Sequence, residues 1–316
     1  MKIVFMGTPD FAVASLDGIV KAGFDVAAVI TATDKPAGRG KRIQYSAVKR
    51  YALENGIDTI LQPEKLKNED FLNQLRAINA DLFVVVAFRM LPEVVWNMPP
   101  KGTINLHASL LPQYRGAAPI NWAVINGDTE TGVSTFFIQQ EIDTGKVIMQ
   151  EKIAISEFDN AGTVHDKLMN IGADTLVQTI RKIEAGDIQP IDQSEISEVV
   201  ELKPAPKIFK DDCKIDWNQP AEKVFNLIRG LSPYPGAFSI MVTDKEDNLK
   251  VFETEYAIKS HNLEPGTILT DGKTGFTVAV NDGFIKINEL QIAGKKRMKT
   301  EDFLRGFNPE NGKMIS

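Results

Sequence analysis

An asparagine and a histidine two residues apart are the side chains best suited to chemistry in this 316-residue chain. Asn105 and His107 belong to the apolar–polar alternation Ile104-Asn105-Leu106-His107. In a strand, residues two apart share a face, so the amide and the imidazole point the same way. An amide can stabilise an oxyanion and an imidazole can move a proton, which suits attack on a carbonyl group. Taken alone, the triplet is more typical of an ordinary strand edge.

The residues after the histidine extend this triplet into a longer motif. Ser109-Leu110-Leu111-Pro112 is followed by Tyr114-Arg115-Gly116. Pro112 and Gly116 interrupt regular structure, which places the Asn–His pair at the end of a strand and before a loop. Further along the chain, Asp143 opens the stretch Asp143-Thr144-Gly145.

These motifs together resemble those of the folate-dependent formyltransferases. That family has N-x-H, then S-L-L-P, then an aromatic residue, Arg and Gly, with an Asp in a DTG stretch downstream. The N-terminal segment Met1–Phe11 and the loop Asp34–Arg42 resemble, more narrowly, the members that act on tRNA. The resemblance implies transfer of the formyl group of 10-formyltetrahydrofolate to the α-amino group of methionyl-initiator tRNA, in translation initiation and without a metal.

The resemblance also implies a role for individual residues. His107 is the expected general base, Asp143 orients its imidazole, and Asn105 holds the oxyanion together with the His107 N–H. The residues expected to line the folate site are Phe88, Met90, Leu91, Ser109, Leu110, Leu111 and Pro112. The residues expected to contact tRNA are Arg39, Lys41, Arg42, Lys295, Lys296 and Arg297.

Two loops bear on ligand binding. Asp34–Ile43 is predicted to be an exposed basic loop, whose glycines would let it adapt to a phosphate backbone. In the segment Phe88–Pro92 the family usually has a glycine where this chain has Arg89. The arginine could reshape the folate pocket or point outward.

Composition indicates a globular protein without a disulfide or a metal site. The chain is 43% hydrophobic and 25% charged. Its three histidines and one cysteine are scattered, without metal-ligand spacing. The single Cys213 excludes an internal disulfide and fits a reducing cytoplasm, and no apolar run approaches the ~18 residues of a membrane span. We expect a cytoplasmic protein and, because nothing marks an obligate apolar interface, a monomer.

The charge distribution limits how nucleic acid could be held. From Pro204 onward, 16 Lys and Arg balance 16 Asp and Glu, so residues 1–203, with 20 against 26, carry the whole net charge of −6. A tRNA partner would therefore have to be held by local basic patches rather than by the global field.

The pattern of elements predicts an α/β chain with two domains. Apolar runs at Lys2–Met6, Asp25–Thr31 and Leu82–Ala87 alternate with helical patterns, which favours a parallel sheet. After Pro204, five short strands with Gly and Asp turns suit a small β-barrel of the oligonucleotide-binding (OB) type. We predict a Rossmann-like catalytic domain over 1–187, a linker over 188–207 and an OB-like, tRNA-binding domain over 208–316.

Other functions remain open from the residues themselves. Sugar-amine and glycinamide ribonucleotide formyltransferases share the Asn, His and Asp with similar spacing, but the basic loop and the C-terminal barrel argue against them. An inactive folate- or tRNA-binding module is the alternative outside enzymes. The intact Asn105, His107 and Asp143 argue against it, because a binding module needs no general base.

Overall fold

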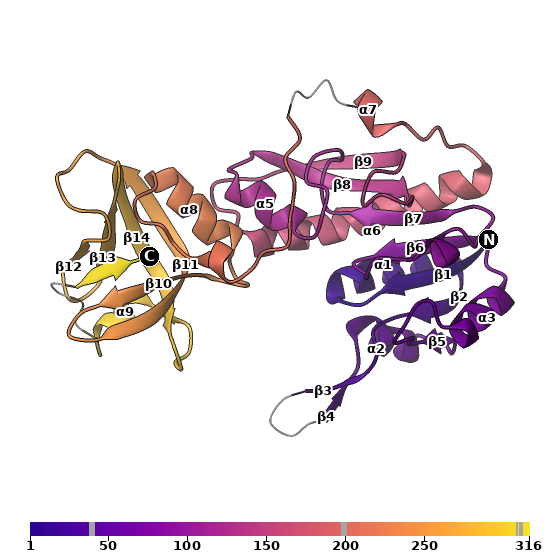
Figure 1. The fold of residues 1–316 in the computed structure, drawn as a ribbon, viewed down its shortest axis with the longest axis horizontal. Coiled ribbons are helices and arrows are strands. Elements are labelled where there is room, and N and C mark those ends of the chain that lie inside the picture. The colour runs from indigo at the N-terminus through magenta and orange to yellow at the C-terminus, as the bar shows by residue number, and fades with distance from the viewer. Residues whose placement is uncertain (38–41, 197–200, 308, 310–311) are drawn as a thin grey trace. The chain divides into compact units, whose positions relative to one another are not determined.

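The computed structural model describes residues 1–37, 42–196, 201–307, 309 and 312–316, and it divides into two compact units. The N-terminal unit comprises Met1–Gly116, Thr131–Ile153 and His165–Pro204. The C-terminal unit comprises Ala117–Glu130, Ala154–Val164 and Ala205–Ser316. Figure 1 shows a sheet flanked by helices in the former and an antiparallel, barrel-like sheet in the latter.

The N-terminal unit is built on a seven-stranded sheet in the order β5-β2-β1-β6-β7-β8-β9. The strands are β1 (Lys2–Gly7), β2 (Asp25–Ile30), β5 (Ile60–Leu61), β6 (Leu82–Val86), β7 (Thr103–His107), β8 (Glu130–Phe137) and β9 (Val147–Ala154). All pairings from β5 to β7 are parallel, whereas β8 runs antiparallel to β7. The predicted parallel α/β sheet is confirmed.

Helices cover both faces of this sheet, which explains why its central strands are apolar throughout. The helices of this unit are α1 (Asp10–Lys21), α2 (Ala47–Glu54), α3 (Glu69–Ile78), α4 (Glu93–Trp96), α6 (Ala161–Ala185) and α7 (Gln193–Ile196), whereas α5 (Pro119–Ile125) belongs to the C-terminal unit. On one face, α3 packs in a cluster with Val4 and Val85. On the other, Gly18 of α1 lies against α6, and so does Leu106 of β7.

The C-terminal unit is a six-strand antiparallel path that almost closes on itself. Its elements are η1 (Asp211–Cys213), α8 (Ala221–Gly230), β10 (Ala237–Val242), β11 (Glu246–Ile258), β12 (Ile268–Thr270), β13 (Phe276–Val280), β14 (Gly283–Ile292), β15 (Met298–Lys299), α9 (Thr300–Leu304) and β16 (Lys313–Ile315). The order is β12-β13-β14-β11-β10-β16, and a bridge between Thr267 and Lys313 brings its two edges together. The predicted small barrel is confirmed.

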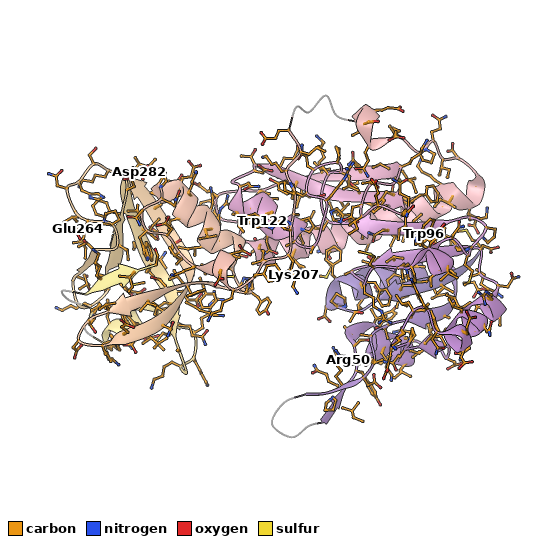
Figure 2. The ribbon with its side chains drawn as sticks, viewed as in Figure 1. Arg50, Trp96, Trp122, Lys207, Glu264 and Asp282 are labelled. Atoms are coloured by element: carbon orange, nitrogen blue, oxygen red, sulfur yellow. The ribbon has the colours of Figure 1, made fainter. Side chains whose placement is uncertain are left out.

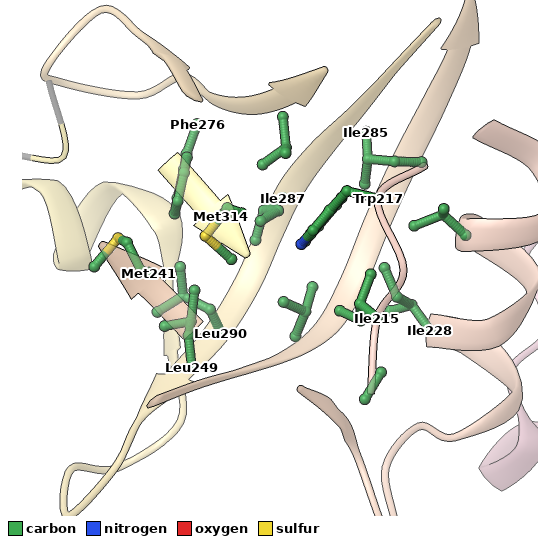
Figure 3. Close-up of a cluster of buried hydrophobic side chains, with 14 of the residues drawn as sticks. Ile215, Trp217, Ile228, Met241, Leu249, Phe276, Ile285, Ile287, Leu290 and Met314 are labelled. Carbon is green, nitrogen blue, oxygen red and sulfur yellow. The ribbon is translucent and has the colours of Figure 1, made fainter. Parts of the chain in front are cut away.

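An apolar core fills this barrel (Figure 3). Ile285, Ile287 and Leu290 of β14 point into it beside Trp217, and all four are at most 2% exposed. The Trp217 indole N–H donates to the Ser239 hydroxyl at 2.9 Å, so its one polar atom is satisfied. At the entry to this unit, Trp122 of α5, labelled in Figure 2, donates its indole N–H to the Pro206 carbonyl.

Three local predictions differ from the structure. The basic loop is a short hairpin of β3 (Lys35–Ala37) and β4 (Arg42–Gln44), which Figure 1 shows extending away from the parallel sheet. The linker contains α7, and the segment after the fifth predicted barrel strand also forms β15, α9 and β16. These elements are two to five residues long, too short to show a hydrophobic period. No helix among the described residues is long and apolar enough to cross a membrane.

Candidate functional site

His107 lies at the carboxyl end of β7, on the face opposite α6. Because Leu106 packs against α6, its neighbours Asn105 and His107 point to the other side, where Asn105 pairs with Val85 of β6. His107 is 7% exposed. Its Nε2 lies 2.8 Å from the Tyr114 carbonyl, which can only accept, so Nε2 carries a hydrogen. The other ring nitrogen, Nδ1, is left to face Asp143.

The Asp143 carboxylate is 3.8 Å from His107 Nδ1 and is held in place by the backbone. Its Oδ2 accepts the Gly116 N–H at 2.9 Å. The residue has φ +54°, in the left-handed region that costs a non-glycine residue on the order of 1 kcal/mol. At 3.8 Å the carboxylate and the imidazole attract each other without a direct hydrogen bond.

The loop that carries Asp143 passes tightly against β8. A Cβ placed on Gly145 would lie 1.6 Å from the Phe137 carbonyl oxygen, so only glycine allows this approach. The Phe137 N–H in turn donates to the Lys146 carbonyl. This geometry is a physical reason for the glycine of the DTG stretch.

Asn105 stands beside this pair with its amide free. The side chain is partly buried and has no hydrogen-bond partner among the residues that the structure describes. An unpaired amide on the same strand face as an imidazole is suited to hold a ligand oxygen, because its NH₂ group supplies two donors. The predicted Asn105, His107 and Asp143 are thus brought together.

The loop after His107 is fixed by buried hydrogen bonds. The Ser109 hydroxyl donates to the Gln113 carbonyl at 2.6 Å. The Ser134 hydroxyl donates to the Ser109 carbonyl and accepts the Leu111 N–H. Ser109, Leu111 and Pro112 are buried and Leu110 is partly buried, so these side chains hold the shape of the loop.

The segment around Arg89 is fastened to its neighbour by the arginine itself. The guanidinium donates to the carbonyls of Glu64, at 2.8 Å, and Pro63. The Arg89 side chain is exposed and is directed to the neighbouring segment that carries these two carbonyls. Leu91 is buried in the core, Phe88 packs against that core and Met90 is 71% exposed.

The predicted tRNA contacts are scattered. Arg39 and Lys41 lie outside the described residues, and so does the side chain of Arg42, whose backbone begins β4. Lys295 and Lys296 are exposed. Arg297 is paired with Glu289 and lies 4.3 Å from the centre of the Phe252 ring.

A polar anchor at the base of the β3–β4 hairpin was not predicted. Lys49 Nζ lies 2.5 Å from Asp34 and 2.7 Å from Gln62, while the Gln62 amide donates to Asp34 and to the Ala32 carbonyl. Hydrogen bonds from Gln62 and Lys49 lower the pKa of Asp34. The anchor fixes the direction in which the basic hairpin leaves the sheet.

A groove in the C-terminal unit combines aromatic rings with lysines. It has a volume of about 760 Å³, and its lining includes Phe209, Tyr234, Lys210 and Lys250. Tyr234 is 82% exposed and Phe209 is 63% exposed. Exposed rings beside cations are the features on which single-stranded nucleic acid stacks.

Gln193 is a residue of this site that no sequence motif indicated. It lies in α7, within the predicted linker, yet it is 2% exposed and contacts both Arg115 and the Asp143 loop. No group of three or more His, Cys, Asp or Glu side chains in the described part of the chain is placed to hold a metal ion.

Crystal structures of other proteins share the fold. One is WlaRD, a sugar 3N-formyl transferase in the presence of dTDP and 5-N-formyl-THF; it is 21% identical with a TM-score of 0.66, over 94% of this chain and 99% of that one. HypX from Aquifex aeolicus in complex with tetrahydrofolic acid is 18% identical with a TM-score of 0.64, over 96% of this chain and 47% of that one.

Sequence comparisons give the family. The formyl transferase model matches residues 1–180, and the model of the formyl transferase C-terminal domain matches residues 207–308. A methionyl-tRNA formyltransferase of Bacteroides fragilis is 58% identical over 98% of this chain and 95% of its own length. The methionyl-tRNA formyltransferase of Flavobacterium johnsoniae is 52% identical over 97% of this chain and 96% of its own length. The chain therefore belongs to the methionyl-tRNA formyltransferase branch of the formyl transferase family.

Proposed function

We propose that this chain transfers the formyl group of 10-formyltetrahydrofolate to the α-amino group of methionyl-initiator tRNA. The observation that carries the proposal is the grouping of His107, Asp143 and the unpartnered Asn105 amide at the end of β7. It occurs in a chain 58% identical to a methionyl-tRNA formyltransferase.

The first step is attack of the amine on the formyl carbonyl, and it requires a base. His107 Nε2–H is committed to the Tyr114 carbonyl, so Nδ1 is the nitrogen that accepts the amine proton. The resulting imidazolium donates its Nε2–H to the Tyr114 carbonyl and faces the Asp143 carboxylate across 3.8 Å. An imidazole is suited to this role because it exchanges protons near neutral pH.

The carbonyl oxygen becomes an oxyanion as the amine adds. The Asn105 amide supplies donors for it, and one well-placed donor of this kind lowers a barrier by about 3–4 kcal/mol. The imidazolium then returns its proton to the folate nitrogen as the bond between that nitrogen and the formyl carbon breaks. The products are the formylated amine and tetrahydrofolate, so the proton count balances without an outside base.

The folate lies, in this proposal, between the loop of Phe88, Met90 and Leu91 and the loop of Ser109–Pro112. Arg89 and Ser134 hold these two loops from behind, which leaves backbone groups to face the pterin ring. The buried side chains among them act by shaping the loops.

The tRNA would be held by local groups in each unit. In the N-terminal unit, the Lys49–Asp34–Gln62 anchor positions the basic hairpin that carries Arg39, Lys41 and Arg42. In the C-terminal unit, Tyr234, Phe209 and Lys210 offer stacking and charge, and Lys295, Lys296 and Arg297 add a basic turn. We also expect the protein to be cytoplasmic and monomeric. Light scattering can measure its oligomeric state.

The test is single-turnover formyl transfer from 10-formyltetrahydrofolate with three acceptors in parallel: methionyl-initiator tRNA, methionyl-elongator tRNA and amino sugars. We expect product only with the initiator tRNA, and about a 10²–10⁴-fold lower rate for His107→Ala. Transfer to a sugar would overturn the tRNA assignment. Folate binding without transfer to any acceptor would instead support a binding module.

A further inference from the structure

We infer that Gln193 is a positioning residue for the formyl-transfer site, which it serves by fixing the loop of Asp143; this rests on the proposed function. Its Nε2 donates to the carbonyls of Asp143, at 2.9 Å, and Gly145, at 2.8 Å. Its Oε1 accepts from Arg115 Nε, at 3.0 Å, and Nη2, at 2.6 Å. The residue lies 50 positions after Asp143 in the chain.

The contacts use the full capacity of the amide. A glutamine side chain has two N–H donors and two acceptor lone pairs, and here each has a partner. The partners also fix which way round the amide sits, because two carbonyls require donors and a guanidinium requires an acceptor. No other side chain of this length supplies both, so the environment specifies glutamine.

The contacts close a ring around the catalytic carboxylate. Arg115 is bound through its side chain to Gln193, and Gln193 is bound to the backbone of Asp143. The Asp143 carboxylate is bound to the N–H of Gly116, which is the next residue after Arg115. A partly buried network in which the central amide has all its partners favours one arrangement over its alternatives.

The ring holds Asp143 where its own backbone preference would not. With φ +54° the residue is in the left-handed region, which aspartate enters more readily than most residues but still at a cost, so the surrounding contacts help to maintain it. Once the Gln193 donors are lost, the loop can relax and the 3.8 Å separation from His107 Nδ1 is no longer fixed. A misplacement of about 1 Å in a catalytic group can lower the rate about 10²-fold.

The informative variant is Gln193→Glu. It keeps the shape and the acceptor for Arg115 but removes both donors to the Asp143 loop. We expect kcat to fall about 10- to 100-fold with little change in KM for tRNA. Gln193→Leu removes all four hydrogen bonds, and its kcat should fall by at least as much. Thr179→Val, which removes the buried hydrogen bond to Thr135 within the same unit, is the control for a loss of stability alone.

A double-mutant cycle with Asp143→Asn separates positioning from general damage. If Gln193 acts through Asp143, Gln193→Glu should lower kcat by less than about 3-fold in the Asp143→Asn background. An equal fold-loss in both backgrounds would overturn the inference, as would an unchanged kcat in the single variant. If Asp143→Asn and His107→Ala themselves leave the rate unchanged, it is the proposed function that fails. Should Gln193→Glu not fold, Arg115→Met opens the same ring from its other side.

Discussion

The two units of the molecule differ in how far their candidate functional side chains are buried. In the N-terminal unit, His107, Asp143 and Gln193 are buried or nearly so and are held by backbone groups. In the C-terminal unit, the groove presents Tyr234 and Phe209 to solvent above an apolar core. Chemistry requires groups fixed within fractions of an ångström, whereas holding a large flexible partner requires exposed groups that can adapt.

The sheets explain part of this difference. The parallel strands β6 and β7 end at the same edge of their sheet, so the loops that follow them leave it side by side, next to His107. The antiparallel barrel offers no such edge, and its side chains alternate between the core and the outer surface. The predictions that follow test whether catalysis belongs to the N-terminal unit and tRNA binding to exposed groups.

The largest expected effect is on the rate of chemistry. Asn105→Ala should lower kcat about 10²–10³-fold, because it removes a donor to the oxyanion, while KM for tRNA stays within about 3-fold. Rapid-quench formylation at saturating substrates measures this, with a thermal melt to show that the fold is kept. A rise in KM alone would mean that Asn105 binds substrate and does not act on the transition state.

The next effect is on stability in the C-terminal unit. Ile287→Ala should lower its free energy of unfolding by about 3 kcal/mol, since Ile287 is 1% exposed in the barrel core. Urea unfolding followed by fluorescence of Trp217, with Trp96→Phe and Trp122→Phe in the background, reports on this unit, because the indole lies in the same core. At a temperature where the variant remains folded, kcat should be unchanged. A selective loss of kcat there would show that the barrel takes part in the chemistry.

A smaller effect is expected on tRNA affinity. Tyr234→Ala should raise KM for tRNA about tenfold without changing kcat, which corresponds to the loss of one stacked base. Phe158→Ala is the matched control, because Phe158 is an 86% exposed aromatic residue of the same unit outside the groove. Equal effects of the two substitutions would rule out the groove as a specific site.

The smallest effect concerns the anchor of the hairpin and depends on pH. The pKa of Asp34 is lowered by hydrogen bonds from Gln62 and Lys49, so its ionised form stabilises the fold. That contribution is present above the ordinary pKa of about 3.9 and is lost as the pH falls through the lowered value. The difference in melting temperature between the natural protein and Asp34→Asn should therefore be steady near neutral pH and shrink in acid. A difference that grows in acid would contradict this assignment.

The sheet, the barrel and the reactive pair were predictable from the amino-acid sequence. Continuous apolar runs indicated strands buried on both faces, and the period of two placed Asn105 and His107 on one side of β7. These features depend on neighbours in the chain, and local sequence records them. The sequence motif identified the DTG stretch but not the reason for its glycine. The reason is the close approach of Gly145 to the Phe137 carbonyl.

The tertiary structure alone decided what surrounds that pair. It turned Arg89 toward the carbonyls of Pro63 and Glu64, and it set Nδ1 of His107 opposite Asp143. It also brought Gln193 from a segment without any motif into the middle of the site. The reason is physical: polar contacts between segments 25 or more residues apart depend on how the chain packs, and no local period or propensity encodes them.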